Sequence, residues 1–408
     1  MNKRQYPVYT VTEKAERSIR GGHPWVYHTE ILETSGEAEN GGLVDVVSKK
    51  NRYLGTGLLS LESKIRVRLI SHNANDRFDE AFFERRLRHA IDYRRTVMGE
   101  DFSCCRLIFG EADLFPGLTV DRFGDILVTQ TLSIGMERRK EMLFPMLYRI
   151  LTESGEKISG IYERNDVAIR RLEGLEEGKG FFPLPGVDTS GLTGKTEIVE
   201  NGIRYEVDYV EGQKTGFFLD QKYNRQAVAR LSKGKKVLDC FTHTGAFALN
   251  AAAAGAAHVR AVDISPDAIA LAEENARRNG LTNMSFQTAN VFELLTQYAQ
   301  EGGCDYDFII LDPPAFTKSN ATVKNAVRGY KEINLKAMKL LPRGGYLATC
   351  SCSHFMTDEL FRKMLHEAAA DACVQLRQIE GRQQSPDHPI LWNVPETDYL
   401  KFYLFQVF

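Results

Sequence analysis

The clearest pattern of apolar and polar positions in the chain lies in residues 235–263. An apolar run that starts at Val237 ends in a turn of small residues, an alanine-rich segment follows over 246–254, and a second apolar run ends at Asp263. This order predicts strand, turn, helix and strand, which is typical of the nucleotide-binding half of a doubly wound α/β sheet. Asp263 follows Gly245 by roughly the 20 residues at which a carboxylate reaches the ribose of a bound nucleotide. We therefore expect a ligand with a ribose at this turn.

The residues of the turn narrow the choice of ligand. Thr242 and Thr244 stand where a dinucleotide-binding turn would have further glycines. A dinucleotide fold uses G-x-G-x-x-G, because the pyrophosphate lies on the helix N-terminus. The turn thus argues against NAD and favours a nucleoside without phosphates, for which S-adenosylmethionine (SAM) is the candidate. A plain strand–helix–strand unit without a ligand is the alternative.

The alternation of strands and helices continues from Asp263 to the end of the chain. The predicted strands are 284–288, 307–312, 345–350, 374–379 and 399–408, and the predicted helices are 266–279, 291–300, 323–341 and 357–370. We predict an α/β fold with a class I (Rossmann-like) seven-stranded sheet, whose last members form an antiparallel pair. The Asn201-Gly202 dipeptide predicts a β-hairpin over 197–208.

Two smaller domains are predicted before this sheet. Residues 1–73 alternate over short runs separated by glycine-rich turns, which indicates a β-rich module with strands near 8–11, 43–47, 53–59 and 65–70. The middle of the chain predicts a helix over 76–98, strands near 106–109, 118–121, 126–131 and 160–163, and a helix near 136–151. We describe it as an α+β linker domain of the pattern strand–strand–helix–strand–strand. The predicted domains are 1–73, 74–195 and 196–408, with the Gly/Pro-rich stretch 178–194 at the second boundary.

One helix has an apolar face and many arginines. Phe82, Phe83, Leu87 and Ile91 fall on one face of the predicted helix, and Arg85, Arg86, Arg88, Arg94 and Arg95 are expected largely elsewhere. Such arginines are either a solvated face or a contact to an RNA backbone.

Bulk composition excludes several classes of protein. The 408 residues are 43% hydrophobic and 26% charged, as in a globular protein of two or three domains, and the net charge of −2 gives no overall basic field. A local basic patch is still compatible with an RNA partner. No apolar run is long enough to cross a membrane, and the polar N-terminus does not resemble a signal peptide, so we expect a cytoplasmic protein without a membrane partner. The seven cysteines are unpatterned, which suits a reducing compartment and predicts no metal site.

Polar residues mark the carboxyl ends of the predicted strands, where ligands bind in an open α/β sheet. These residues are Asp239, Phe241, Asp263, Asn290, Asp312 and the segment 350–353. Two carboxylates followed by an amide, Asp239, Asp263 and Asn290, suit the methionine amine, the ribose and the adenine of SAM.

The last two of these strand ends indicate the chemistry. Asp312-Pro-Pro-Ala-Phe316 is a rigid exit from a strand, because proline restricts its own φ and the preceding residue. A D-P-P-x-F stretch is typical of methyl transfer to a base, at an amino nitrogen or at a ring atom; a simple turn cap is the alternative.

Methylation of cytosine C5 requires a thiolate that adds to C6. Cys350 and Cys352 fall on one face of the predicted strand, and Cys352 lies nearer its carboxyl end. We expect Cys352 to be the nucleophile and Cys350 to lie inside the sheet; inert burial is the alternative for either thiol.

Several motifs together are similar to those of a known family. They are Gly22-His-Pro-Trp25, Phe115-Pro-Gly-Leu-Thr-Val-Asp-Arg-Phe-Gly124, Thr215-Gly-Phe-Phe-Leu-Asp-Gln221, Phe241-Thr-His-Thr-Gly-Ala-Phe247, Asp312-Pro-Pro-Ala-Phe316, Arg328-Gly-Tyr-Lys-Glu-Ile-Asn334 and Ser351-Cys-Ser353. Over essentially the whole chain, the sequence resembles the PUA-domain-containing ribosomal RNA large-subunit cytosine-5 methyltransferases. The resemblance implies a PUA-like N-terminal domain, SAM as cofactor and 23S ribosomal RNA as partner, and a homodimer is left open.

The resemblance also implies roles for single residues. It implies Cys352 as nucleophile and Asp312 as the residue that engages a flipped cytosine. We expect the cofactor-binding residues to be Thr215, Gly216, Asp220, Gln221, Asp239, Phe241, Thr244, Gly245, Asp263, Asn290 and Asp312. We expect the RNA-binding residues to be Arg20, Gly22, His23, Trp25, Arg328 and Lys331, although Trp25 is also expected to anchor a core. Two positions depart from the family: Asn290 replaces an acidic residue near adenine, and Cys350 replaces an apolar or aromatic residue.

The predicted function is therefore SAM-dependent methylation of C5 of a cytosine in 23S ribosomal RNA through a covalent Cys–C6 adduct. One alternative is a guanine or adenine methyltransferase that acts on ribosomal RNA. The other is a non-catalytic RNA-binding or ribosome-assembly protein that binds SAM.

Overall fold

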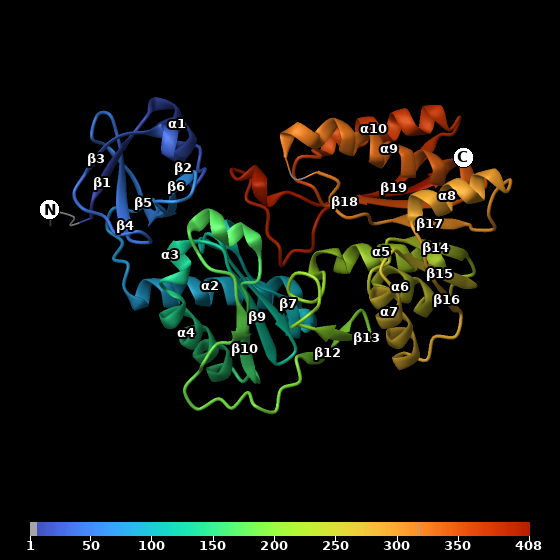
Figure 1. The fold of residues 1–408 in the computed structure, drawn as a ribbon, viewed down its shortest axis with the longest axis horizontal. Coiled ribbons are helices and arrows are strands. Elements are labelled where there is room, and N and C mark those ends of the chain that lie inside the picture. The colour runs from blue at the N-terminus through green and yellow to red at the C-terminus, as the bar shows by residue number, and fades with distance from the viewer. Residues whose placement is uncertain (1–5, 318) are drawn as a thin grey trace. The chain divides into compact units, whose positions relative to one another are not determined.

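The computed structural model describes residues 6–317 and 319–408, which form two compact units (Figure 1). The first unit contains the chain up to Ile198, Val207–Leu219 and Pro386–Thr397. The second unit contains Val199–Glu206, Asp220–Ser385 and Asp398–Phe408. The return of Pro386–Thr397 to the first unit has no signal in the local sequence pattern, because it depends on contacts between residues far apart in the chain.

The N-terminal part of the first unit is a six-stranded sheet. Its strands are β1 (Val8–Val11), β2 (Trp25–Tyr27), β3 (Ile31–Ser35), β4 (Leu43–Ser48), β5 (Tyr53–Leu59) and β6 (Ile65–Ser71), in the order β2-β6-β5-β4-β1-β3. The β-rich prediction is confirmed, but strands β2 and β3 and helix α1 (Glu13–Arg20) were missed. The N-cap of α1 is Thr12, and the helix buries just Ala15 and Ile19, which is too few apolar positions for a clear helical period.

The central part of the first unit is a five-stranded sheet with three helices. The strands are β7 (Cys104–Phe109), β8 (Leu118–Phe123), β9 (Ile126–Thr131), β10 (Gly160–Arg164) and β11 (Lys179–Phe181), and the helices are α2 (Glu80–Met98), α3 (Ile134–Glu137) and α4 (Lys140–Glu153). The predicted order strand–strand–helix–strand–strand is wrong, because three strands precede α3 and α4. The fifth strand, β11, lies inside the stretch 178–194, where glycines and prolines obscured it. It pairs with β10 at the edge of the sheet, where a strand forms backbone hydrogen bonds with one neighbouring strand and not with two.

One arginine of α2 does not lie on a solvated face. Arg94 is fully buried, and its guanidinium binds the Asp113 carboxylate at 2.7 Å. Arg94 follows Ile91 by three residues, so it shares the apolar face of the helix, and Asp113 supplies the counter-charge that makes burial tolerable.

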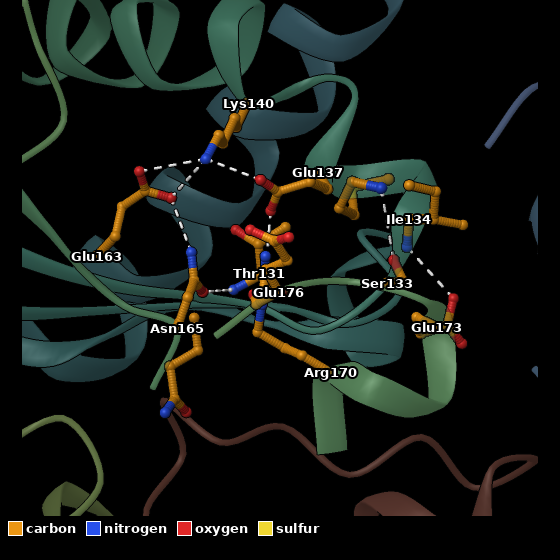
Figure 2. A network of polar contacts seen from close by, with 12 residues as sticks. Thr131, Ser133, Ile134, Glu137, Lys140, Glu163, Asn165, Arg170, Glu173 and Glu176 are labelled. Atoms are coloured by element: carbon orange, nitrogen blue, oxygen red, sulfur yellow. Dashed lines mark hydrogen bonds and ion pairs between the residues drawn. The ribbon is translucent and has the colours of Figure 1, made fainter. Parts of the chain in front are cut away.

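A partly buried polar network ties the central strands to α3 and α4 (Figure 2). Arg170 donates to the carbonyl of Thr131 and to Glu137 Oε2 at 3.0 Å. Lys140 bridges Glu137 at 2.8 Å and Glu163 at 3.0 Å. Burial alone would raise the pKa of Glu137, but the hydrogen bonds from Lys140 and Arg170 hold it below its ordinary value. The network thus keeps its charges paired.

The second unit is built on a seven-stranded sheet, which the hairpin β12 (Lys195–Glu200) and β13 (Ile203–Asp208) precedes in the chain. The φ angles of Asn201 and Gly202 are 55° and 77°, as the predicted Asn-Gly turn requires. The seven strands are β14 (Lys236–Cys240), β15 (His258–Asp263), β16 (Met284–Thr288), β17 (Phe308–Leu311), β18 (Tyr346–Ser351), β19 (Leu376–Arg382) and β20 (Lys401–Val407). Their order is β16-β15-β14-β17-β18-β20-β19, and β20 is antiparallel to both neighbours. The α/β fold and the antiparallel last pair are confirmed.

Helices cover both faces of this sheet (Figure 1). They are α5 (Lys222–Ser232), α6 (Ala246–Ala253), α7 (Pro266–Arg278), α8 (Val291–Gln300), α9 (Val323–Leu340) and α10 (Asp358–Asp371). Leu238, Ile309 and Leu347 pack toward α8, α9 and α10, whereas the alternate strand positions pack toward α5 and α6. Strands that are buried on both faces explain the nearly continuous apolar runs in the sequence. Within the described ranges, no helix is both long and apolar enough to cross a membrane.

Candidate active site

The turn between β14 and α6 is tightly held by the Asp239 carboxylate. Asp239 Oδ2 accepts hydrogen bonds from Thr242 Oγ1 at 2.5 Å and from the Ala248 N–H at 3.0 Å. Phe241 and His243 have φ angles of 64° and 50°, which side chains with a Cβ rarely adopt. A strained backbone of this kind is typical of a functional turn, where the surrounding structure fixes it.

Asp263, at the end of β15, binds the same turn from the neighbouring strand. Its Oδ2 accepts the His243 N–H at 2.9 Å and its Oδ1 accepts the Ser265 N–H at 3.0 Å. Each carboxylate oxygen has a second lone pair, so Asp263 still has the capacity to accept hydroxyl groups.

Asp239 has an oxygen that the described protein leaves unused. The residue is fully buried, and Oδ1 finds no hydrogen-bond partner among residues 6–317 and 319–408. Burial, together with the negative charges of Asp312 and Asp263, raises the pKa of Asp239 to about 7. An orphan buried acceptor is rare in folded proteins, and it fits a cationic ligand group such as the ammonium of the SAM methionine moiety.

Asp312 follows β17 and faces α5. Gln221 Nε2 donates to Asp312 Oδ1 at 3.0 Å, and Gln221 Oε1 accepts from Asn224 Nδ2 at 2.6 Å. Asp312 is partly buried, and loss of water around it, together with the charge of Asp220, raises its pKa to about 6. The carboxyl group is therefore poised to be either a hydrogen-bond donor or an acceptor near neutral pH.

The two thiols lie in different surroundings. Cys350 is inside β18 and fully buried, and burial and the Asp312 charge raise the pKa of its thiol well above the ordinary value. β18 ends at Ser351, so the expectation that Cys352 lies on the strand is wrong. Cys352 follows the strand directly and is partly exposed, and its Sγ lies 4.0 Å from the Pro313 carbonyl oxygen.

Three residues that the sequence reasoning did not select hold this segment in place. Ser351 Oγ donates to Tyr330 Oη at 3.1 Å, Ser353 Oγ donates to the Thr317 carbonyl at 2.9 Å, and Lys401 Nζ donates to the Ser353 carbonyl at 2.7 Å. Tyr330 is part of the motif 328–334, which could have indicated its importance. No pattern in the sequence indicates that Thr317 or Lys401 contacts this segment.

The other predicted cofactor residues of the second unit have partners of their own. Asp220 is buried and accepts the Tyr399 hydroxyl at 2.6 Å, and the Phe241 ring packs on Phe292. Thr244 is buried in the turn that ends at Gly245. Asn290 caps α8, because its Oδ1 accepts the Phe292 N–H at 3.0 Å. None of these contacts tests a role in cofactor binding.

Thr215 and Gly216 belong to the first unit. Thr215 is buried and donates to Asp121 Oδ2 at 2.6 Å. Gly216 has a φ of 124°, and a Cβ there would lie 2.7 Å from a Val207 methyl group. Both residues thus have structural partners inside the first unit, and their assignment to the cofactor stays a prediction.

The predicted RNA-binding residues of the N-terminal module lie at the end of α1, in the loop that follows it and at the start of β2. Trp25 is partly buried, and its Nε1 donates to Glu111 at 3.0 Å, as expected of an anchor. His23 lies 3.2 Å from Glu396, and Asn393 donates to the Gly22 carbonyl, so the segment 386–397 supports this loop. Arg20 is exposed at the end of α1.

The two predicted RNA-binding residues of the second unit lie on α9. Arg328 is exposed, whereas Lys331 pairs with Asp371 at 2.8 Å.

Comparison with known proteins agrees with this architecture. The family model of S-adenosylmethionine-dependent methyltransferases matches residues 189–406, and that of PUA-like domains matches residues 10–72. A ribosomal RNA large subunit methyltransferase I from Shewanella denitrificans is 42% identical over 391 residues, which cover 95% of this chain and 96% of that protein. One of the same name from Klebsiella pneumoniae (strain 342) is 38% identical over 399 residues, which cover 97% of each chain.

Solved structures share the fold at lower sequence identity. A structure from Streptococcus mutans, described as a candidate SAM-dependent methyltransferase, has a TM-score of 0.81 at 22% identity and covers 98% of this chain and 99% of its own. Another, of a candidate methyltransferase complexed with SAH, has a TM-score of 0.82 at 22% identity and covers the same shares.

These matches confirm the PUA-like module, the methyltransferase fold and SAM as cofactor. The chain is a SAM-dependent methyltransferase and belongs to the ribosomal RNA large subunit methyltransferase I family.

Proposed function

We propose that this enzyme methylates C5 of a cytosine in 23S ribosomal RNA, with Cys352 as the nucleophile. The observation that carries the proposal is the position of Cys352, whose Sγ lies 4.0 Å from the carbonyl of Pro313, directly after Asp312. A partly exposed thiol at the exit of β17 suits addition to a pyrimidine ring, whereas methylation of an amino group needs no thiol. The relatives' name, ribosomal RNA large subunit methyltransferase I, supports the choice of RNA.

Under this proposal, residues of the second unit hold the cofactor. Asp239 would accept the methionine ammonium through its unused Oδ1, and Asp263 would accept the ribose hydroxyls. Asn290 would lie near adenine, and Phe241, Thr244 and Gly245 would line the turn. When bound, SAM supplies an electrophilic methyl group.

The chain's own groups would carry the base chemistry. The Cys352 thiolate forms a bond to C6, and the C5=C6 electron pair moves to C5, which then accepts the methyl group. Asp312, whose pKa is raised to about 6, would hydrogen-bond the N3 edge of the flipped cytosine while the adduct forms. A base then removes the C5 proton, and the thiolate leaves.

The N-terminal module would contribute RNA contacts. Arg20, Gly22, His23 and Trp25 lie on the segment that joins α1 to β2, and cations and aromatic rings of this kind contact phosphates and bases. We retain residues 1–73, 74–195 and 196–408 as the proposed domains.

Analysis of the product nucleosides tests this function. Ribosomal RNA from a strain that lacks the gene is incubated with the enzyme and labelled SAM, digested to nucleosides and resolved by chromatography. We expect the label in 5-methylcytidine. Label in a methylated guanosine or adenosine would refute the proposal, and so would the absence of any label from an enzyme that binds SAM.

A further inference from the structure

Lys401 is a buried cation beside the segment that contains Cys352. It is the first residue of β20, it pairs with Ser351 in the β18–β20 register, and it is 4% exposed. Its Nζ donates to the carbonyl oxygens of Ser353 at 2.7 Å and Tyr399 at 2.9 Å. Lys401 therefore holds the end of the cysteine segment from the neighbouring strand.

This ammonium group lacks a carboxylate in direct contact. Among residues 6–317 and 319–408, no Asp or Glu oxygen forms an ion pair with Lys401 Nζ, and two carbonyls take two of its three N–H groups. Burial of a cation without a counter-charge is strongly unfavourable. Burial lowers the pKa of Lys401 to about 8, while the charges of Asp398, Cys352 and Asp358 act in the opposite direction. Lys401 thus stays largely protonated at neutral pH.

We propose that Lys401 is a positioning residue whose ammonium group is the counter-charge of the Cys352 thiolate. The proposal rests on the proposed function, since it takes Cys352 as the nucleophile. The reaction forms an anion at the sulfur atom of Cys352, and a nearby positive charge stabilises such an anion. Lys401 Nζ already binds the carbonyl of Ser353, the next residue in the chain. A lysine with a purely structural role would more commonly pair with a carboxylate.

The role of Lys401 is electrostatic, and it does not transfer a proton. The Cys352 S–H proton leaves to solvent, both electrons stay on sulfur, and Lys401 keeps its three protons. The S–C6 bond then forms with this electron pair. When the C5 proton is removed after methylation, the C6–S bond breaks and the pair returns to sulfur beside Lys401. The ammonium thus stabilises the sulfur charge before addition and after elimination.

The environment of Cys350 shows the opposite arrangement. Its thiol is fully buried next to the Asp312 carboxylate, which disfavours a second negative charge there. Two thiols that are two residues apart in the chain are therefore distinguished by the charge that each one faces.

The test measures the pH dependence of Cys352 alkylation in the full-length enzyme without RNA. Iodoacetamide labelling is followed for each cysteine by mass spectrometry, and the exposed Cys373 is the internal reference for reagent reactivity. Lys401→Met removes the charge and the donors, Lys401→Gln removes the charge but keeps an N–H donor, and Lys401→Arg keeps the charge. Lys363→Met, at an exposed position of α10, is the matched control.

We expect Lys401→Met and Lys401→Gln to slow Cys352 alkylation at pH 7 about ten-fold and to move its half-maximal rate up by about one pH unit. Lys401→Arg should restore much of the rate, and Lys363→Met should change nothing. The proposal is overturned if Lys401→Gln alkylates like the unmodified enzyme, even where Lys401→Met does not fold. If Lys401→Gln behaves as expected but Cys352→Ala still forms 5-methylcytidine, the proposed function fails while the charge effect stands.

Discussion

The carboxyl groups of Asp239 and Asp312 make the free energy of unfolding depend on pH. Burial raises the pKa of Asp239 from 3.8 to about 7 and, to a smaller extent, that of Asp312 to about 6. The folded state therefore binds protons that the unfolded state has already released between about pH 4 and pH 7. Because the folded state binds more protons in this window, the free energy of unfolding falls as pH rises through it.

Asp239→Asn should flatten this slope. The variant cannot ionise, so the loss of stability between pH 4 and pH 7 should shrink by about 3 kcal/mol, the order of magnitude that linkage gives for a shift of this size. Urea unfolding at several pH values measures it, with Asp267→Asn on the exposed start of α7 as control. A slope identical to that of the unmodified protein would show that Asp239 is ionised throughout.

Residues of this kind also mark the limit of what the sequence predicts. Asp239, Asp263 and Asp312 were found because they end apolar strands, which is a local signal. Lys401 was missed, and the burial of Arg94 was not predicted. A buried cation depends on partners elsewhere in the chain, which are the Ser353 carbonyl for Lys401 and Asp113 for Arg94. From a single sequence, a charged side chain is therefore predicted to be exposed.

At the scale of elements, the turn between β14 and α6 depends on Gly245. Its φ is 83°, and a Cβ there would lie 2.4 Å from Leu249 Cδ1 and 2.9 Å from the Ala272 Cβ on α7. The glycine therefore allows both the left-handed backbone and the close approach of two helices.

Gly245→Ala should destabilise the enzyme by about 3 kcal/mol, the sum of backbone strain and overpacking. Gly280→Ala is the matched control, since its φ is also positive, at 64°, but nothing lies within 4 Å of its Cβ. It should cost about 1 kcal/mol from strain alone. Thermal unfolding compares the two variants, and equal losses would contradict the role given to close packing.

Elements were predicted well where periodicity was strong. The strands and helices of the second unit follow the expected order, because most of them bury a continuous apolar run or stripe. Helix α1 and strands β2, β3 and β11 were missed, since α1 buries two residues, β2 and β11 have three residues each, and β3 is largely exposed. Their formation depends on the sheets on which they pack.

At the scale of the whole molecule, the N-terminal sheet and the central sheet belong to one unit. Arg68 on β6 binds Glu173 at 2.7 Å, and both side chains are nearly buried. Glu173 also accepts the Ile134 N–H at 3.3 Å (Figure 2). Deletion of residues 1–73 would leave Glu173 without its cation, so point variants are the better test of RNA binding.

Arg20→Ala and Arg328→Ala should each weaken RNA binding without changing SAM affinity. If each side chain contacts one phosphate, each variant should lower the slope of log affinity against log salt by about one. Filter binding to ribosomal RNA at several salt concentrations measures the slope. Lys157→Ala, at a side chain that is 85% exposed, is the control. An unchanged slope for both arginine variants would exclude these residues from the RNA surface.

The most direct test of the central claim is covalent trapping by RNA that carries 5-fluorocytidine at the target. Fluorine cannot leave C5 as a proton does, so the adduct between sulfur and C6 persists after methyl transfer and is resolved by denaturing electrophoresis. We predict that the unmodified enzyme and Cys350→Ala are trapped, and that Cys352→Ala is neither trapped nor active. Loss of the adduct in Cys350→Ala and its retention in Cys352→Ala would contradict the account and move the nucleophile into β18.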